Sequence, residues 1–164
     1  MRTDWYQNAR FGMFIHWGAY SVIGIDEWIR SQRKMTIEEY APTLDMFTAS
    51  RYDAREWAKA AKNAGMKYIV LTAKHHDGLC LFDSKLTDYK STNYGAKRDL
   101  VREFTDAARA EGLHVGLYYS LLDWHHDDYP KYDDMFHPMR GNEAYKDEKI
   151  DFDNYLKYMH GQVE

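Results

Sequence analysis

The sequence predicts an α/β fold with parallel strands, arranged as the first three βα units of a partial, TIM-like (β/α)8 barrel. Three short apolar segments, each suited to a buried strand, alternate along the chain with helical segments. Alternation of this kind produces a parallel sheet with right-handed crossovers. Each apolar segment also runs directly into polar and aromatic side chains, and α/β folds place their functional sites at this end of their strands.

The second apolar segment, residues 68–73, has the clearest strand pattern. It is nearly continuous and rich in β-branched side chains, which is typical of a strand buried on both faces. The polar run Lys-His-His-Asp at 74–77 follows before Gly78 turns the chain. A solvated loop is the alternative interpretation, but four polar groups against a strand end are more than a turn needs.

The first and third apolar segments end in the same way. Residues 11–18 read Phe-Gly-Met-Phe-Ile-His-Trp-Gly and place His16 and Trp17 near their end. Residues 114–122 form the third expected strand and precede a polar stretch that begins Asp-Trp-His-His at 123–126. The polar stretch that begins at residue 123 can line a pocket or form a plain polar loop.

The helical segments have recognisable ends. Thr36 and Glu39 form a Thr-x-x-Glu capping box, while Asp53 and Asp99 are suited to cap the helices that follow them. Glycine follows two of these helices, where a left-handed residue commonly ends a helix. We therefore expect helices over residues 35–46, 53–65, 100–111 and 151–163.

Other α/β folds fit the sequence less well than a barrel does. A dinucleotide-binding sheet would have a glycine-rich phosphate turn after its first strand, but residues 11–18 contain no G-x-G-x-x-G, and no Walker loop occurs. A full barrel takes ~250 residues and eight βα units, whereas this chain has 164 residues and three expected units. Residues 1–164 are therefore expected to form the N-terminal portion of one barrel domain.

Composition narrows the partners expected of the chain. The net charge of −4 offers no basic surface for nucleic acid, and no apolar run approaches the ~20 residues of a membrane helix. Cys80 is the only cysteine, so no internal disulfide can form. The start lacks the apolar core of a signal peptide, so the location of the protein is undetermined, and it is expected to be cytoplasmic if this start is native.

Aromatic residues make up 16% of the chain, which suits a large core or a pocket that stacks on sugar rings.

Four motifs, in register over nearly the whole chain, resemble the α-L-fucosidases of glycoside hydrolase family 29. They are FGMFIHWG at 11–18, Glu27-Trp28, KHHDG at 74–78, and YYSLLDW at 118–124 followed by two histidines. The resemblance implies retaining hydrolysis of terminal α-L-fucose from a fucosylated carbohydrate, by a nucleophile and an acid/base carboxyl ~5 Å apart. Both carboxylates are expected beyond Glu164, so no catalytic residue, metal or cofactor is expected within this chain.

The resemblance also implies six fucose-binding residues: His16, Glu27, Trp28, His75, His76 and Tyr118. A neutral imidazole offers one donor and one acceptor, which suits a hydroxyl group that is both. Tyr118 is chosen over Tyr119 because neighbouring strand residues point to opposite faces. The alternatives are a core role for His16, a surface ion pair for Glu27, and a bracing role for one of the adjacent histidines.

Two other interpretations of the chain's function remain. The eight histidines suggest a metal site, but barrel metal sites commonly use His-x-His at a strand end, and the histidines here are adjacent. A catalytically inactive remnant that only binds sugar is the non-enzymatic alternative. In either case part of a barrel leaves strand edges and inner faces uncovered, so the chain alone is expected to be marginally stable and to self-associate.

Overall fold

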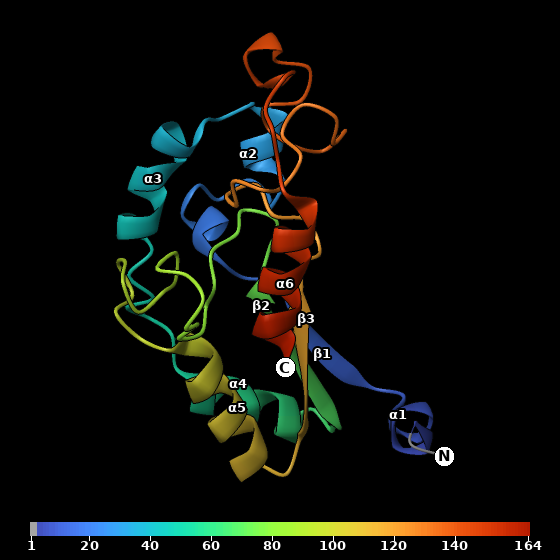
Figure 1. The fold of residues 1–164 in the computed structure, drawn as a ribbon. Coiled ribbons are helices and arrows are strands. Elements are labelled where there is room, and N and C mark those ends of the chain that lie inside the picture. The colour runs from blue at the N-terminus through green and yellow to red at the C-terminus, as the bar shows by residue number, and fades with distance from the viewer. Residues whose placement is uncertain (1–2) are drawn as a thin grey trace.

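The structure, a computed structural model, describes residues 3–164 as one three-stranded sheet with helices packed against it (Figure 1). The elements in chain order are α1 (Asp4–Ala9), β1 (Gly12–Ile15), the 3-10 helix η1 (Ala19–Val22), α2 (Ile29–Gln32), α3 (Ile37–Met46), α4 (Ala54–Asn63), β2 (Tyr68–Lys74), α5 (Leu100–Ala110), β3 (His114–Tyr119), the 3-10 helix η2 (Glu143–Tyr145) and α6 (Phe152–Val163).

The sheet has the strand order β1-β2-β3, and both pairs of neighbours are parallel. Ile69 of β2 lies between Met13 of β1 and Val115 of β3 in the register. The central strand is the most buried, and Ile69 and Leu71 are completely shielded from solvent. The expectation of an α/β fold with three parallel strands is therefore confirmed.

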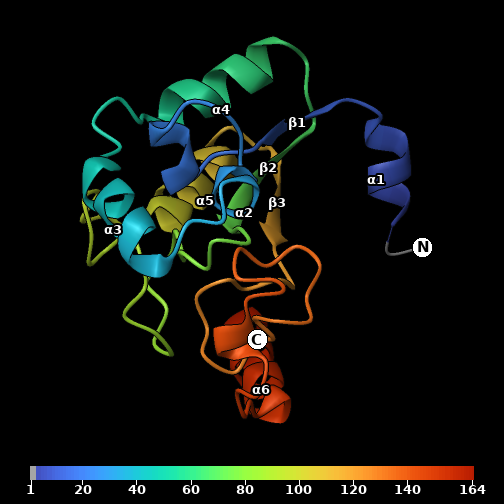
Figure 2. The same cartoon turned by 90° about the horizontal axis from the view of Figure 1, so that it is seen from above.

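Helices α4 and α5 lie side by side against the sheet in both views (Figures 1 and 2). Phe104 and Ala108 of α5 and Ala58 and Ala61 of α4 are fully buried in the same apolar core as Leu71. The core therefore lies between these two helices and one face of the sheet. The ends of the strands are left for other contacts.

The expected caps form. The Thr36 hydroxyl accepts a hydrogen bond from the Glu39 amide (3.2 Å), and the Glu39 carboxylate accepts one from the Thr36 amide (2.9 Å). Asp53, Asp99 and Asp151 each accept a hydrogen bond from the first turn of α4, α5 and α6. Carboxylates at these positions also interact favourably with the helix dipole. The four expected helices are thus observed, and each begins and ends within two residues of its expected bounds.

Helix α6 is linked to the end of β3 and to the residues that follow it by two tyrosine hydroxyls. The Tyr119 hydroxyl donates to the Gln162 side chain (2.6 Å), and the Tyr155 hydroxyl donates to the carbonyl of Leu121 (2.8 Å). Tyr119 therefore faces α6, which leaves Tyr118 for the opposite side of the strand. Within residues 3–164, none of the helices is both long and apolar enough to cross a membrane.

Candidate functional site

The three strands bring their polar ends together. His16 follows β1, His75 follows β2, and Tyr118 lies near the end of β3. The His75 ring centroid lies 4.7 Å from that of His16, 4.0 Å from that of His76 and 5.8 Å from that of Tyr118. Parallel strands end at one edge of a sheet, so residues far apart in sequence form one cluster there.

Trp28 and Glu27 extend this cluster from the loop after β1. The Trp28 ring lies 4.5 Å from the His76 ring, and the Asp26 carboxylate holds the Trp28 amide at 2.7 Å. Burial raises the pKa of Tyr118, and the charge of Glu27 raises it further. Ring contacts therefore bring together five of the six residues expected to bind sugar, and Glu27 is the neighbour of one of them, Trp28.

Both adjacent histidines are neutral at neutral pH. Burial, reinforced by neighbouring histidines, lowers the pKa of His75 to about 2. Burial also lowers the pKa of His76 to about 4, with further contributions from His16 and Lys74. The rings of His75 and His76 both lie in the cluster, so neither ring points away from it into the loop. Nδ1 of His75 is buried and has no hydrogen-bond partner among the described residues.

A hydrogen bond assigns the tautomer of His76. Its Nδ1 lies 2.6 Å from the Ser120 hydroxyl, which itself lies 2.7 Å from the carbonyl of Leu122. The single hydroxyl proton of Ser120 is donated to this carbonyl, so the hydroxyl accepts from Nδ1–H of His76. Nε2 of His76 is then the unprotonated nitrogen, and it is available to accept a hydrogen bond from a ligand.

Of the other aromatic residues that follow the strands, some belong to the cluster and others to the apolar core. Trp17 packs on Phe47, Tyr52 and Trp57 with ring separations of 4.9, 4.9 and 5.3 Å, so it belongs to the core rather than to the cluster. Trp124 joins the cluster, 5.3 Å from the His76 ring. The two histidines after it stack elsewhere, one on Tyr89 and the other near Tyr155 and Tyr158.

Three further residues belong to the cluster. Tyr20, in η1, lies 5.2 Å from the His75 ring, and Phe14 lies 5.8 Å from both His16 and Tyr118. Ser120 is the third, through its bond to His76. Of these three residues, only Phe14 could have been predicted from the sequence to join the cluster. It is two residues before His16 and hence on the same face of β1.

The remaining polar residues of the run at 74–77 pair with other segments. Lys74 is completely buried against Asp123 (2.6 Å), and the Asp77 carboxylate accepts a hydrogen bond from the hydroxyl of Tyr40 (2.8 Å). Burial raises the pKa of Asp77, and the bonds from Tyr40 and from the Leu79 amide offset part of this increase. These two residues support the site without lining it.

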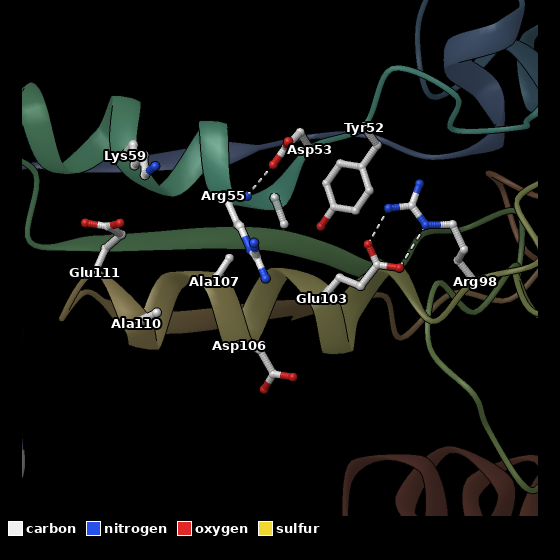
Figure 3. A pocket seen from close by; sticks show the side chains of 11 residues that line it. Tyr52, Asp53, Arg55, Lys59, Arg98, Glu103, Asp106, Ala107, Ala110 and Glu111 are labelled. Atoms are coloured by element: carbon white, nitrogen blue, oxygen red, sulfur yellow. Dashed lines mark hydrogen bonds and ion pairs between the residues drawn. The ribbon is translucent and has the colours of Figure 1, made fainter.

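A separate hollow of about 590 Å³ lies between α4 and α5 (Figure 3). Its charged side chains come from these helices and from the residues at their ends, and Arg98, just before α5, forms an ion pair with Glu103 at one end of it. None of the six expected sugar-binding residues lines it. Within the described part of the chain, no three side chains of the metal-ligating types come together as a candidate metal site.

The fold and the cluster define an α/β protein with a ring-lined polar site at the carboxyl edge of a parallel sheet. A sequence model of the family described as "Alpha-L-fucosidase" matches residues 1–164, and the chain belongs to this family. The resemblance carried by the four motifs is therefore confirmed.

Individual relatives agree with this membership. An α-L-fucosidase of Branchiostoma floridae is 38% identical over 78% of this chain and 33% of its own length. The structure of α-L-fucosidase isoenzyme 1 from Paenibacillus thiaminolyticus is 58% identical and superposes with a TM-score of 0.97, over 99% of this chain and 39% of that one. The α-fucosidase of Thermotoga maritima in complex with fucose is 35% identical with a TM-score of 0.80, over 97% and 42%. The chain thus spans about a third of the curated relatives' length.

Proposed function

We propose that the protein carrying this chain is a retaining α-L-fucosidase, and that residues 1–164 form the N-terminal part of its (β/α)8 barrel and the fucose-binding wall. The convergence of His16, His75, His76 and Tyr118 on one edge of the sheet carries the proposal. Family membership and the fucose complex of the Thermotoga maritima relative support it.

The chemistry of the cluster suits a sugar hydroxyl. Nε2 of neutral His76 accepts a hydroxyl proton, and Nδ1 of His75 has no partner among the described residues. A buried polar atom without a partner costs about 1–3 kcal/mol, so a bound hydroxyl would recover this energy. A deoxy analogue would leave the same atoms unpaired, and the site would therefore discriminate against it.

The remaining expected residues complete the recognition of fucose. The carboxylate of Glu27 would accept a hydrogen bond from a second hydroxyl. Trp28 is half-buried beside His76 and would offer a ring to the apolar C–H face of the sugar. Arranged in this way, the wall orients the anomeric carbon toward the two carboxylates of a retaining mechanism, which we expect from residues beyond Glu164.

The test uses the protein that carries this chain, at its natural length. We expect it to release nitrophenol from 4-nitrophenyl α-L-fucoside and to form α-fucose first, as nuclear magnetic resonance would show. We expect H76N to raise KM at least tenfold, because it removes the ring that accepts the hydroxyl proton. H114N is the matched control, because His114 lies at the opposite end of β3. Absence of hydrolysis, or equal effects of the two variants, would contradict the proposal.

A further inference from the structure

A small cavity lies behind the cluster, between the start of α3 and the loop that joins β3 to α6. Its volume is about 50 Å³, and its lining includes Arg30, Trp124 and His137. These three side chains are 2%, 1% and 1% exposed. Four of their nitrogen atoms have no hydrogen-bond partner among the described residues: Nε and Nη1 of Arg30, Nε1 of Trp124 and Nε2 of His137. Three buried polar side chains thus meet around one space with their groups unused.

These groups are donors only. A guanidinium and an indole N–H cannot accept a hydrogen bond. His137 behaves in the same way, because its Nδ1 accepts from the Met139 amide (3.0 Å) and the proton is therefore on Nε2. The carbonyl of Trp124 lies near this Nε2 without forming a hydrogen bond of good geometry. Burial, and then the charge of Arg30, lowers the pKa of His137 to about 3, so the ring is neutral.

Among the described residues, no carboxylate forms an ion pair with Arg30. Of the acidic groups that act on it, Asp77 is engaged by Tyr40, and no ion pair within 4.0 Å links Asp77 to Arg30 among the described residues. Glu38 is exposed at the rim, where the Thr36 hydroxyl and its own amide bond to it. Lys131 also lines the cavity, but Glu148 at 2.7 Å neutralises it. Within residues 3–164, the charge of Arg30 therefore has no ion-pair partner at this cavity.

A guanidinium does not lose its proton in proteins, and burying an unpaired charge is costly. The cavity has room for a few water-sized species, since one needs roughly 10–15 Å³ of such space. We propose that this cavity binds a small monovalent anion, such as chloride, held by Arg30, Trp124 and His137. The anion supplies the missing charge and accepts the unused hydrogen bonds.

The position of Trp124 connects the anion to the cluster. Its ring lies 5.6 Å from that of Trp28 and 5.3 Å from that of His76. An anion bound to its indole N–H would fix the ring on which these two residues pack. The inference does not depend on the proposed function, because binding of the anion is measured without any sugar.

The test is a thermal melt of the natural-length protein in increasing chloride, at constant ionic strength made up with gluconate, which is too large for the cavity. We expect a saturable rise in Tm of about 1–2 °C once chloride is tenfold above its Kd. R30M should abolish the rise, while R55M, which removes an exposed arginine outside the cavity, should retain it. W124F should reduce the apparent chloride affinity. A rise of equal size in R30M, or no saturable rise in the unmodified protein, would overturn the proposal.

Crystals grown in bromide provide a second measurement that does not depend on whether a variant folds. We expect an anomalous peak within hydrogen-bond distance of the Arg30 guanidinium and the Trp124 Nε1 atom. Density for water alone at this place, without an anomalous signal at high bromide, would overturn the proposal.

Discussion

The ammonium of Lys74 lies 2.6 Å from the carboxylate of Asp123, and both side chains are almost completely shielded from water. This pair joins the end of β2 to the segment that follows β3. The second oxygen of Asp123 accepts hydrogen bonds from the amides of His125 and His126, both at 3.0 Å. Burial alone would raise the pKa of Asp123, but Lys74 and these amides outweigh it, so the pKa is lowered. The pair therefore holds together the two chain segments that carry His76 and Trp124.

We expect K74M to destabilise the protein by about 3–5 kcal/mol, because it leaves a buried carboxylate without its cation. The double variant K74M/D123L should lose less than K74M alone, since it removes both charges. The control is K146M, which breaks the exposed pair between Lys146 and Glu143 and should cost at most about 1 kcal/mol. Denaturant unfolding of the natural-length protein measures all three. A double variant no more stable than K74M would show that the charges are not what holds these segments.

Gly78 makes a close approach to this pair. Its φ is +87°, and a Cβ atom there would lie 2.5 Å from Oδ1 of Asp123 and 2.7 Å from Cβ of His125. We expect G78A to cost more than 2 kcal/mol in unfolding free energy, roughly the sum of a strained φ and a steric clash. G24A is the matched control, because Gly24 has a φ of +71° and nothing within 4 Å of the added Cβ. Equal losses in the two variants would mean that φ alone accounts for the effect.

The bond between Ser120 and His76 predicts a change in ligand affinity. S120A removes the acceptor for Nδ1–H, so the proton can move to Nε2, the atom that we expect to accept from the sugar. KM for an aryl fucoside should then rise about 5- to 30-fold, the equivalent of roughly 1–2 kcal/mol, with a smaller effect on kcat. S21A is a suitable control, because Ser21 is exposed and its hydroxyl accepts a hydrogen bond from the local Gly18 amide. An unchanged KM in S120A would refute the assigned tautomer.

Acid should destabilise the protein through its buried histidines. The folded-state pKa is about 2 for His75 and about 4 for His76, both below the ordinary 6.5. The folded state therefore binds fewer protons than the unfolded state below pH 6.5. Each histidine contributes stability that is complete above pH 6.5 and falls by up to about 1.4 kcal/mol per pH unit as the pH drops toward its folded value.

Unfolding free energies measured between pH 7 and pH 5 check this expectation. H76N should show a shallower decline than the unmodified protein, because one of the protonating groups is gone. The comparison between the two proteins cancels the contribution of Asp77, whose raised pKa acts in the opposite direction. Parallel curves for the two proteins would contradict the assignment of a neutral, buried His76.

Elements governed by local chemistry could be predicted from the sequence. The capping residues Thr36, Asp53 and Asp99 start their helices as expected, and the β-branched run at Tyr68–Lys74 is the central strand. Helices α1 and α2 were not anticipated, since they have six and four residues and too short an apolar pattern to detect. For the helix expected over residues 53–65, the spacing of Trp57, Ala60, Ala61 and Ala64 predicts one apolar face, and this prediction is partly wrong. Ala60 and Ala64 are exposed because alanine carries little preference for either face.

The site could be predicted where it depends on strand ends and not where it depends on tertiary contacts. His16, His75 and Tyr118 meet because parallel strands end at one edge, a consequence of topology. The bond between Ser120 and His76 lies just beyond a register shift in the pairing of β2 with β3, between Thr72 and Lys74. The spacing of residues in the sequence does not predict this register shift.

Residues 1–164 expressed alone should self-associate. Phe14, Leu117 and Leu121 are 54%, 48% and 67% exposed, and β1 and β3 each have an unpaired edge in the described sheet. Exposed apolar side chains and open strand edges both promote association between chains. Light scattering should therefore detect dimers or larger species at micromolar concentrations, and F14S/L121S should shift the population toward monomer. The control L86S removes a leucine that is 51% exposed outside the strands. A monodisperse monomer with a sharp cooperative melt would contradict the prediction, because it would mean that the sheet needs no further cover.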